Sequence, residues 1–194
     1  MAQIPLLIIV GPSGVGKTTL YKMLLNEFPN FIALSISYTT RSIRPNEKEN
    51  SNYYYISNEQ FDAMKDSDEF LECATYVGNQ YGTARREVDR IRSQGKIPML
   101  EIEIHGYKQL LATGIPLHGV FVKTDDLETL KQRLLRRGAD MEKDIDRRLQ
   151  RSLQEMEEAK TCPFDMTLVN DTLESSYAIL RKQVKEWYSH ILPE

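Results

Sequence analysis

The sequence predicts an α/β fold, in which a mostly parallel sheet is flanked by helices. Short apolar runs alternate with amphipathic segments along the chain, and a glycine-rich turn joins the first apolar run to a helix-like segment. No internal repeat or low-complexity tract interrupts this order. Because 194 residues suffice for one sizeable core but not for two, we expect a single domain over residues 1–194.

Four apolar runs suit the buried strands of a parallel sheet, which are hydrophobic on both faces. They cover residues 4–10, 97–104, 117–122 and 166–169. The first run has no basic segment before it and is too short to cross a bilayer. We therefore interpret it as a strand, and we find no signal peptide or membrane anchor.

Four further segments have helical features, at residues 18–27, 125–137, 142–160 and from 171 towards 187. The second begins with acidic residues and ends with two arginines before Gly138, which suits the helix dipole and a C-terminal stop. The spacing Asp171-x-x-Glu174 predicts a capping box at the start of the last helix.

Residues 35–83 break the alternation, because they are rich in Tyr, Thr, Ser and Asn. Short alternating runs at 53–56 and 70–76 favour strands, and Ser57-x-x-Gln60 between them is a helix-start signal. We predict a small β-rich insertion on the α/β core.

The first predicted strand leads directly into a G-x-x-x-x-G-K-T pattern, made of Gly11, Pro12, Ser13, Gly14, Val15, Gly16, Lys17 and Thr18. Between a strand and a helix this pattern indicates a P-loop, whose backbone N–H groups converge on a polyphosphate. Lys17 adds positive charge, and the Thr18 hydroxyl can ligate Mg²⁺. The alternative is an ordinary glycine turn, and the motif does not name a second substrate.

A second cluster combines Arg41, Arg44 and Tyr53 with neighbouring hydroxyl groups. Arginine binds phosphate in a bidentate manner and the tyrosine hydroxyl adds a neutral donor, so this cluster is a candidate phosphomonoester clamp. A solvated basic loop is the alternative.

A third cluster surrounds Glu72, which lies among apolar neighbours. Its carboxylate could accept paired hydrogen bonds from the N1–H and exocyclic amine of guanine, whereas adenine has no such donor pair. Ser37 or Thr83 could bind the guanine oxygen. The alternative is a surface glutamate beside a hairpin turn.

Glu101 and Glu103 stand at the end of the second predicted strand. Open α/β sheets bind ligands at the carboxyl ends of their strands, where an acid can orient the waters of Mg²⁺. Alternating polar residues at a strand end are the alternative, which explains one glutamate more easily than two.

Together these motifs resemble the guanylate kinase family over nearly the whole chain, at residues 11–18, 35–44, 53, 69–72, 78–83, 100–106 and 169–171. The resemblance implies a P-loop nucleotide kinase fold with a GMP-binding insertion at 35–83 and a helical lid at 137–149. The remaining core would comprise 1–34, 84–136 and 150–194. The implied activity is phosphorylation of GMP, and of dGMP, by ATP with Mg²⁺, as part of purine nucleotide metabolism.

The resemblance also implies residue roles. The catalytic residues would be Lys17, Arg41, Arg137 and Arg148. ATP would contact the P-loop residues Gly11 to Thr18 together with Thr19 and Asn170. GMP would contact Ser37, Arg41, Arg44, Tyr53, Glu72, Tyr81, Thr83 and Glu103. The metal ion would be held by Thr18 and, through water, by Glu101.

The chain departs from the family pattern at Glu101 and Glu103, where the family usually has aspartate. Each glutamate keeps the charge but moves the carboxylate by about 1 Å, a displacement that can cost on the order of a hundredfold in rate when nothing compensates for it.

Composition limits the partners. The net charge of −3 provides no basic field for nucleic acid or an anionic membrane, so we expect neither as a partner. Two isolated cysteines, Cys73 and Cys162, suit a reducing compartment, and we expect a cytoplasmic protein. The expected partners are ATP and GMP or dGMP, and the expected state is a monomer or weak homodimer.

Two other functions fit parts of the sequence. Another P-loop kinase could keep the arginine clamp, but Glu72 with Ser37 and Thr83 would then have no purpose. A non-enzymatic scaffold module of the same fold could bind phosphorylated partners, but such modules usually have degraded P-loops, whereas this one is intact.

Overall fold

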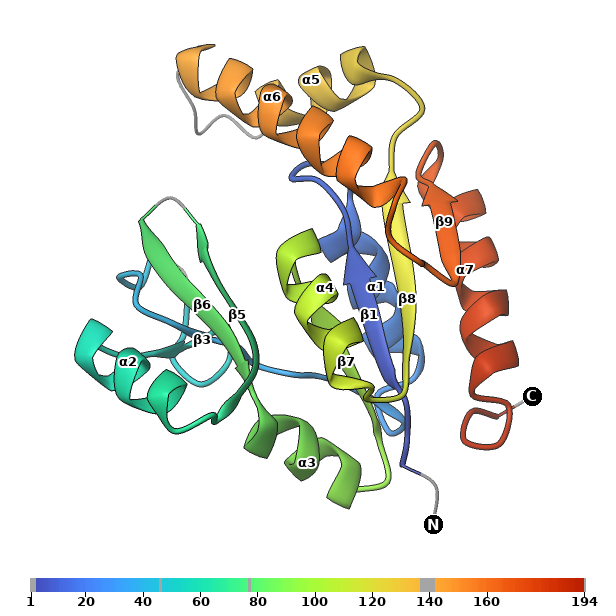
Figure 1. The fold of residues 1–194 in the computed structure, drawn as a ribbon. Coiled ribbons are helices and arrows are strands. Elements are labelled where there is room, and N and C mark those ends of the chain that lie inside the picture. Colours follow the sequence, from blue (N-terminus) through green and yellow to red (C-terminus); the bar gives the residue numbers. More distant parts are fainter. Residues whose placement is uncertain (1–2, 46, 77, 137–141, 194) are drawn as a thin grey trace.

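A computed structural model describes residues 3–45, 47–76, 78–136 and 142–193. Its core is a five-stranded sheet in the order β2-β7-β1-β8-β9, and every neighbouring pair is parallel. The strands are β1 (Leu6–Val10), β2 (Ile32–Leu34), β7 (Ile97–Glu101), β8 (Leu117–Lys123) and β9 (Met166–Val169). Figure 1 shows this sheet at the centre of the molecule, with helices on both faces.

The central strand β1 is buried along its whole length because it contributes side chains to two hydrophobic cores. Leu7 and Ile9 pack with α1 (Lys17–Glu27) and α7 (Leu173–Trp187) on one face of the sheet. Leu6, Ile8 and Val10 pack on the other face, with α3 (Arg85–Ser93) and α4 (Ile104–Thr113). This two-sided burial is the reason why the strand is a continuous apolar run in the sequence.

The predicted β-rich insertion is confirmed as a separate four-stranded sheet in the order β4-β3-β6-β5. Its elements are β3 (Tyr38–Thr39), β4 (Tyr54–Tyr55), α2 (Asn58–Asp66), β5 (Phe70–Tyr76) and β6 (Asn79–Ala84). A small core of Tyr38, Phe61, Phe70 and Ala84 supports it. The predicted helix start at Ser57 is also confirmed, since Ser57 and Gln60 form a capping box by exchanging side-chain to backbone hydrogen bonds at the start of α2.

Two helices, α5 (Leu127–Arg136) and α6 (Glu142–Ala159), cross the end of the core that carries the glycine-rich turn (Figure 1). They pack against each other, and α6 continues without a break through the lid boundary expected at residue 149. Arg137, one of the two predicted lid arginines, lies outside the described residues.

Two local predictions were wrong. The strand predicted over 97–104 ends at Glu101, and α4 begins at Ile104. Ile102 and Ile104 still join the same core as β7, so their apolar character does not distinguish a strand from the start of a helix. The capping box expected at Asp171 does not form, because Thr172 is the N-cap of α7 and its side chain makes no capping bond. Helices α3 and α4 were not predicted from the sequence.

Among the described residues, no helix is long and apolar enough to span a membrane.

Candidate active site

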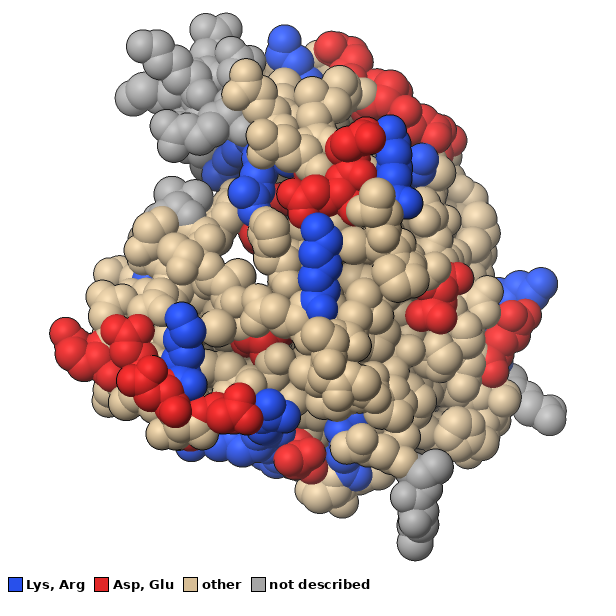
Figure 2. Space-filling model, in the orientation of Figure 1, with Lys and Arg blue, Asp and Glu red and all other residues tan. Residues whose placement is uncertain are grey.

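A cleft of about 770 Å³ is bounded by the glycine-rich turn, the insertion and α6. Figure 2 shows the surface hollowed between the insertion and the α5–α6 pair, with both basic and acidic side chains gathered on the α6 side. The cleft therefore collects residues that the sequence separates by more than a hundred positions, from Gly11 to Glu155.

The glycine-rich turn requires glycine at its first position and holds Lys17 against its own backbone. Gly11 has φ = 149°, and a Cβ there would lie 2.1 Å from the carbonyl oxygen of Val122, so only glycine fits. The Lys17 Nζ donates hydrogen bonds to the carbonyl oxygens of Gly11 (2.7 Å) and Pro12 (3.0 Å), and it lies 3.8 Å from Glu101 Oε1. Lys17 is the first residue of α1, and its side chain therefore folds back over the loop.

Thr18 and Glu101 could hold a divalent cation together. The Thr18 hydroxyl donates to Glu101 Oε1 over 3.5 Å, and both residues line the cleft. No group of three or more His, Cys, Asp or Glu side chains in the described parts of the chain could hold a metal ion by itself. A hydroxyl and one carboxylate suit Mg²⁺, which takes its other ligands from phosphates and water.

The other predicted ATP-binding residues differ in their access to the cleft. Ser13, Gly14 and Gly16 line it, whereas Pro12 and Val15 are buried and Thr19 is exposed on α1. Asn170 is only 5% exposed, and its Nδ2 donates to the carbonyl oxygen of Val15 at 2.7 Å. It supports the loop from behind and does not line the cleft, so its contact with ATP stays a prediction.

The predicted phosphomonoester clamp comes together on the insertion side of the cleft. Arg41 lies over the Tyr53 ring, with Cζ 5.4 Å from the ring centroid, and Tyr81 packs edge-on against Tyr53. Burial raises the pKa of Tyr53 to about 12, so its hydroxyl remains a donor at neutral pH. Arg44 is exposed and lines the same part of the cleft.

Glu47 organises this clamp, although the sequence did not predict it as a site residue. Its carboxylate accepts hydrogen bonds from Arg41 Nη2 (2.9 Å), the Arg44 backbone N–H (2.9 Å) and the Tyr55 hydroxyl (2.8 Å). The bond from Arg41 holds the pKa of Glu47 at about 2. The signal that could have found it is a glutamate six residues after Arg41, which places an acid in the same loop as two arginines.

Glu72 and Thr83 form a buried pair on adjacent strands of the insertion. The Thr83 hydroxyl donates to Glu72 Oε1 at 2.6 Å, and Glu72 is only 6% exposed. Burial raises the pKa of Glu72 to about 7. A Cβ on Gly106 of α4 would lie 2.4 Å from Glu72 Oε2, so the core helix confines the carboxylate that the insertion supplies. Ser37 lines the cleft with Glu72.

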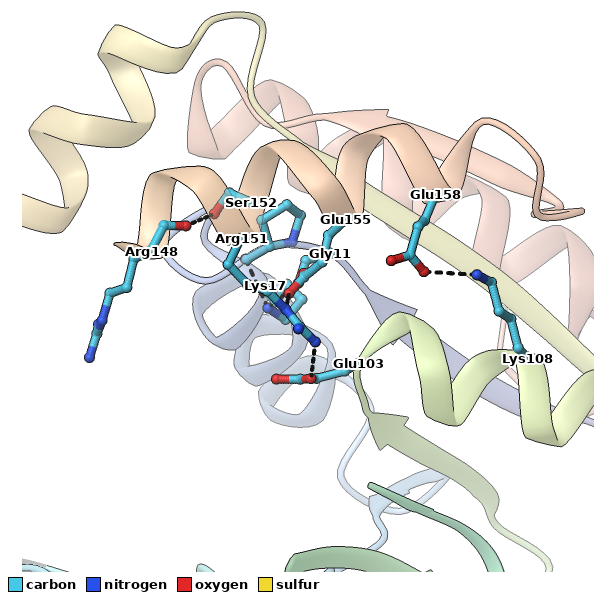
Figure 3. Close-up of polar contacts among 10 residues, drawn as sticks. Gly11, Lys17, Glu103, Lys108, Arg148, Arg151, Ser152, Glu155 and Glu158 are labelled. Carbon is cyan, nitrogen blue, oxygen red and sulfur yellow. Dashed lines mark hydrogen bonds and ion pairs between the residues drawn. The ribbon is translucent and has the colours of Figure 1, made fainter. Parts of the chain in front are cut away.

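Glu103 also lines the cleft, and its side chain faces α6, as Figure 3 shows. It is the N-cap residue of α4, and its Oε2 lies 3.5 Å from Arg151 Nη2. Arg151 Nε also donates to Glu155 Oε1 at 3.2 Å. Burial and, to a lesser extent, the charge of Glu103 together raise the pKa of Glu155 to about 7. Arg148, a predicted lid arginine, lines the same cleft one turn earlier on α6.

Residues 3–187 match the protein-family model described as guanylate kinase. The chain belongs to the guanylate kinase family. It is accordingly an enzyme, a nucleotide-binding transferase with a P-loop, and the resemblance found in its motifs is confirmed.

Curated relatives of the guanylate kinase family support this assignment over most of the chain. The chain is 42% identical over 177 residues to a guanylate kinase of Trichodesmium erythraeum (strain IMS101), and this match covers 91% of this chain and 94% of the relative. It is 40% identical over 173 residues to a guanylate kinase of Chlamydia felis (strain Fe/C-56), covering 89% and 83% of the two chains.

The predicted P-loop kinase fold of the guanylate kinase family is also confirmed. The crystal structure of a guanylate kinase from Anaplasma phagocytophilum superposes with a TM-score of 0.73. The match covers 96% of this chain and 87% of that one at 23% identity, so it shows the fold alone.

Arg151 and Glu155 also line the cleft, and the sequence did not predict either of them as a site residue. Both lie on α6 in a segment that resembles a polar, solvated helix. They are spaced i, i+4 from each other and follow Arg148 on the same face, and that spacing is the signal that could have found them.

Proposed function

We propose that the protein transfers the γ-phosphoryl group of MgATP to the phosphate of GMP, or of dGMP, giving ADP and GDP or dGDP. A phosphate oxygen of the acceptor forms the new bond to the γ-phosphorus. The bond between the γ-phosphorus and the β–γ bridging oxygen breaks, and its electron pair leaves with ADP. The reaction needs no protein nucleophile, since alignment and charge neutralisation carry it.

One observation carries this proposal: a single cleft is lined by the P-loop, the Arg41–Tyr53 clamp and Glu72. Thr83 is fully buried and does not line the cleft, but its hydroxyl donates to Glu72 from behind. The P-loop would bind the donor polyphosphate and the clamp the acceptor phosphate. The Glu72 carboxylate would accept from guanine, while the Thr83 hydroxyl keeps one of its oxygens in place. A sugar phosphate or an adenine nucleotide would not present to Glu72 the adjacent pair of donors that guanine has.

The cations of the cleft have separate roles in this mechanism. Lys17 and the loop N–H groups would stabilise the charge that develops on the transferred phosphoryl group. Arg148 would add positive charge from α6, and Arg137 is proposed to do so as well. Mg²⁺ would be held by Thr18 and, through water, by Glu101, and when bound it neutralises phosphate charge.

Closure of the cleft is part of the proposal, because water that reaches the γ-phosphate would hydrolyse ATP. The insertion (35–83) and the lid (137–149) would close over the core once both nucleotides are bound. Small-angle X-ray scattering with and without a bisubstrate analogue tests this, and identical curves would contradict closure.

The activity is tested by measuring ADP formation from MgATP with GMP, dGMP, AMP, UMP, dTMP and ribose phosphates as acceptors. Lys17→Ala is the blank. Turnover confined to GMP and dGMP supports the assignment, and shows that glutamate at positions 101 and 103 is tolerated. Folded protein that binds GMP but turns over no acceptor would favour a binding module instead. A cytoplasmic location and a monomer or weak homodimer stay predictions.

A further inference from the structure

Two ion pairs connect α6 with the segment from Glu103 through α4 (Figure 3). Arg151 Nη2 lies 3.5 Å from Glu103 Oε2 inside the cleft. Lys108 Nζ lies 2.8 Å from Glu158 Oε2 at a position that does not line the cleft. The two cations have similar exposure, 38% for Arg151 and 41% for Lys108, so the chain itself offers a matched comparison.

Arg151 is held between two carboxylates, because its Nη2 faces Glu103 while its Nε donates to Glu155. Glu155 is buried, so the second contact anchors the guanidinium to the body of α6. An arginine can serve two acceptors at once with its planar fork, which fixes the direction of each bond. The anchored guanidinium therefore restricts where the Glu103 carboxylate can lie.

The position of Glu103 makes this restriction relevant to the acceptor. Glu103 lies on the loop between β7 and α4, in the cleft that also contains Glu72. Its side chain is one methylene longer than the aspartate usual in the family, and it therefore has one more torsion to order. Among the residues that the structure describes, Arg151 forms the ion pair with that carboxylate.

We propose that Arg151 is a positioning residue of the acceptor site, which acts by orienting Glu103 from α6. The inference rests on the proposed function, because it assumes that Glu103 contacts the guanine of GMP. It assigns to α6 a part in acceptor binding, in addition to the charge that Arg148 would bring to the phosphoryl group.

The test is steady-state kinetics with MgATP and GMP for Arg151→Ala, Arg151→Lys and the matched variant Lys108→Ala. We expect Arg151→Ala to raise KM for GMP about fivefold, the upper range for a partly exposed ion pair. The kcat and KM for ATP should change less than about twofold. Arg151→Lys keeps the charge but not the fork, and should recover about half of the loss. Lys108→Ala should leave all constants unchanged.

A double-mutant cycle with Glu103→Gln separates action through Glu103 from direct action. If Arg151 works by orienting Glu103, then Arg151→Ala adds no further increase of KM for GMP in the Glu103→Gln background. Three results would overturn the inference: a full additional increase in that background, a tenfold fall of kcat with unchanged KM, or equal effects of Arg151→Ala and Lys108→Ala.

The unmutated protein distinguishes failure of the inference from failure of the proposed function. If it does not phosphorylate GMP, the proposed function is wrong and the inference falls with it. If it phosphorylates GMP but the Arg151 variants behave like the Lys108 control, only the inference is wrong. Thermal unfolding of each variant confirms that the comparison is made between folded proteins.

Discussion

Replacing Glu72 with glutamine should stabilise the protein and impair it as an enzyme. The carboxylate is 6% exposed, and burial raises its pKa from the ordinary value of 4.5 to about 7. Glutamine has nearly the same shape, and its Oε1 can still accept the hydrogen bond that the Thr83 hydroxyl donates at 2.6 Å. The substitution therefore removes mainly the cost of burying a charge.

The size and sign of the effect follow from the two pKa values. Because the pKa of Glu72 is higher in the folded state than in the unfolded state, the folded protein binds more protons between pH 4.5 and 7. The contribution of Glu72 to the free energy of unfolding is therefore full below pH 4.5 and is lost as the pH rises through 7. A shift of this size corresponds to about 3 kcal/mol. We expect the stability difference, Glu72→Gln minus unmutated protein, to rise by about 3 kcal/mol between pH 4.5 and pH 8.

Equilibrium urea unfolding at pH 4.5, 6, 7 and 8 measures this difference. Glu157→Gln on α6 is the control, because that side chain is 73% exposed and surface substitutions change stability by less than about 0.5 kcal/mol. In parallel, KM for GMP should rise at least about a hundredfold, since the amide presents a donor where the base needs an acceptor. A stability difference that does not change with pH would refute the argument from burial, and an unchanged KM would refute the role in base recognition.

Three further predictions follow from individual contacts. Glu47→Gln should raise KM for GMP about tenfold, because Arg41 loses the charged acceptor that orients it in the clamp. Gly106→Ala should raise KM for GMP about tenfold and lower stability by about 1–3 kcal/mol, because its Cβ would press on the Glu72 carboxylate. His118 stacks on Trp187, its Nδ1 is buried without a partner in the described structure, and burial lowers its pKa from 6.5. The unmutated protein should therefore lose stability as the pH falls below 6.5, and His118→Phe should reduce that loss.

Each of these three predictions has a control variant or an outcome that would contradict it. Glu49→Gln changes an exposed acid in the same loop as Glu47, so equal effects of the two substitutions on KM would mean that the loop charge and not the clamp matters. For Gly106→Ala, a fall in stability with an unchanged KM for GMP would contradict the prediction that the new Cβ disturbs the Glu72 carboxylate. His190 is exposed, so if His190→Phe flattens the acid limb of the stability curve as much as His118→Phe, the argument from burial fails.

Much of the architecture could be predicted from local patterns. β1 is a continuous apolar run because both of its faces are buried, and the second half of β8 is buried in the same way. The P-loop motif places the first turn without further information. The Ser57–Gln60 box is a local interaction and was found. The errors at Glu101 and at Asp171 both concern element ends. After Glu101 the apolar residues suit either a strand or the start of a helix. At Asp171 the helix starts one residue later than expected, with Thr172 as its N-cap.

The candidate site was predictable where a motif carries the chemistry within a few residues, as at Lys17 and Thr18. The site was not predictable where a contact forms only after the chain folds back and brings separate segments together. Glu47 resembles any loop glutamate until Arg41 folds back on it, and Arg151 resembles a solvated helix arginine until α6 lies against Glu103.

The sequence by itself determined that this chain folds as an α/β P-loop protein of the guanylate kinase family, because apolar periodicity and short motifs are local properties. Only the tertiary structure decided the electrostatics of the cleft. The pKa of Glu72 depends on how much water α4 excludes from its carboxylate. The ion pair of Arg151 depends on where α6 lies relative to Glu103. Burial and charge proximity are sums over residues that are distant along the chain, so no local pattern contains them.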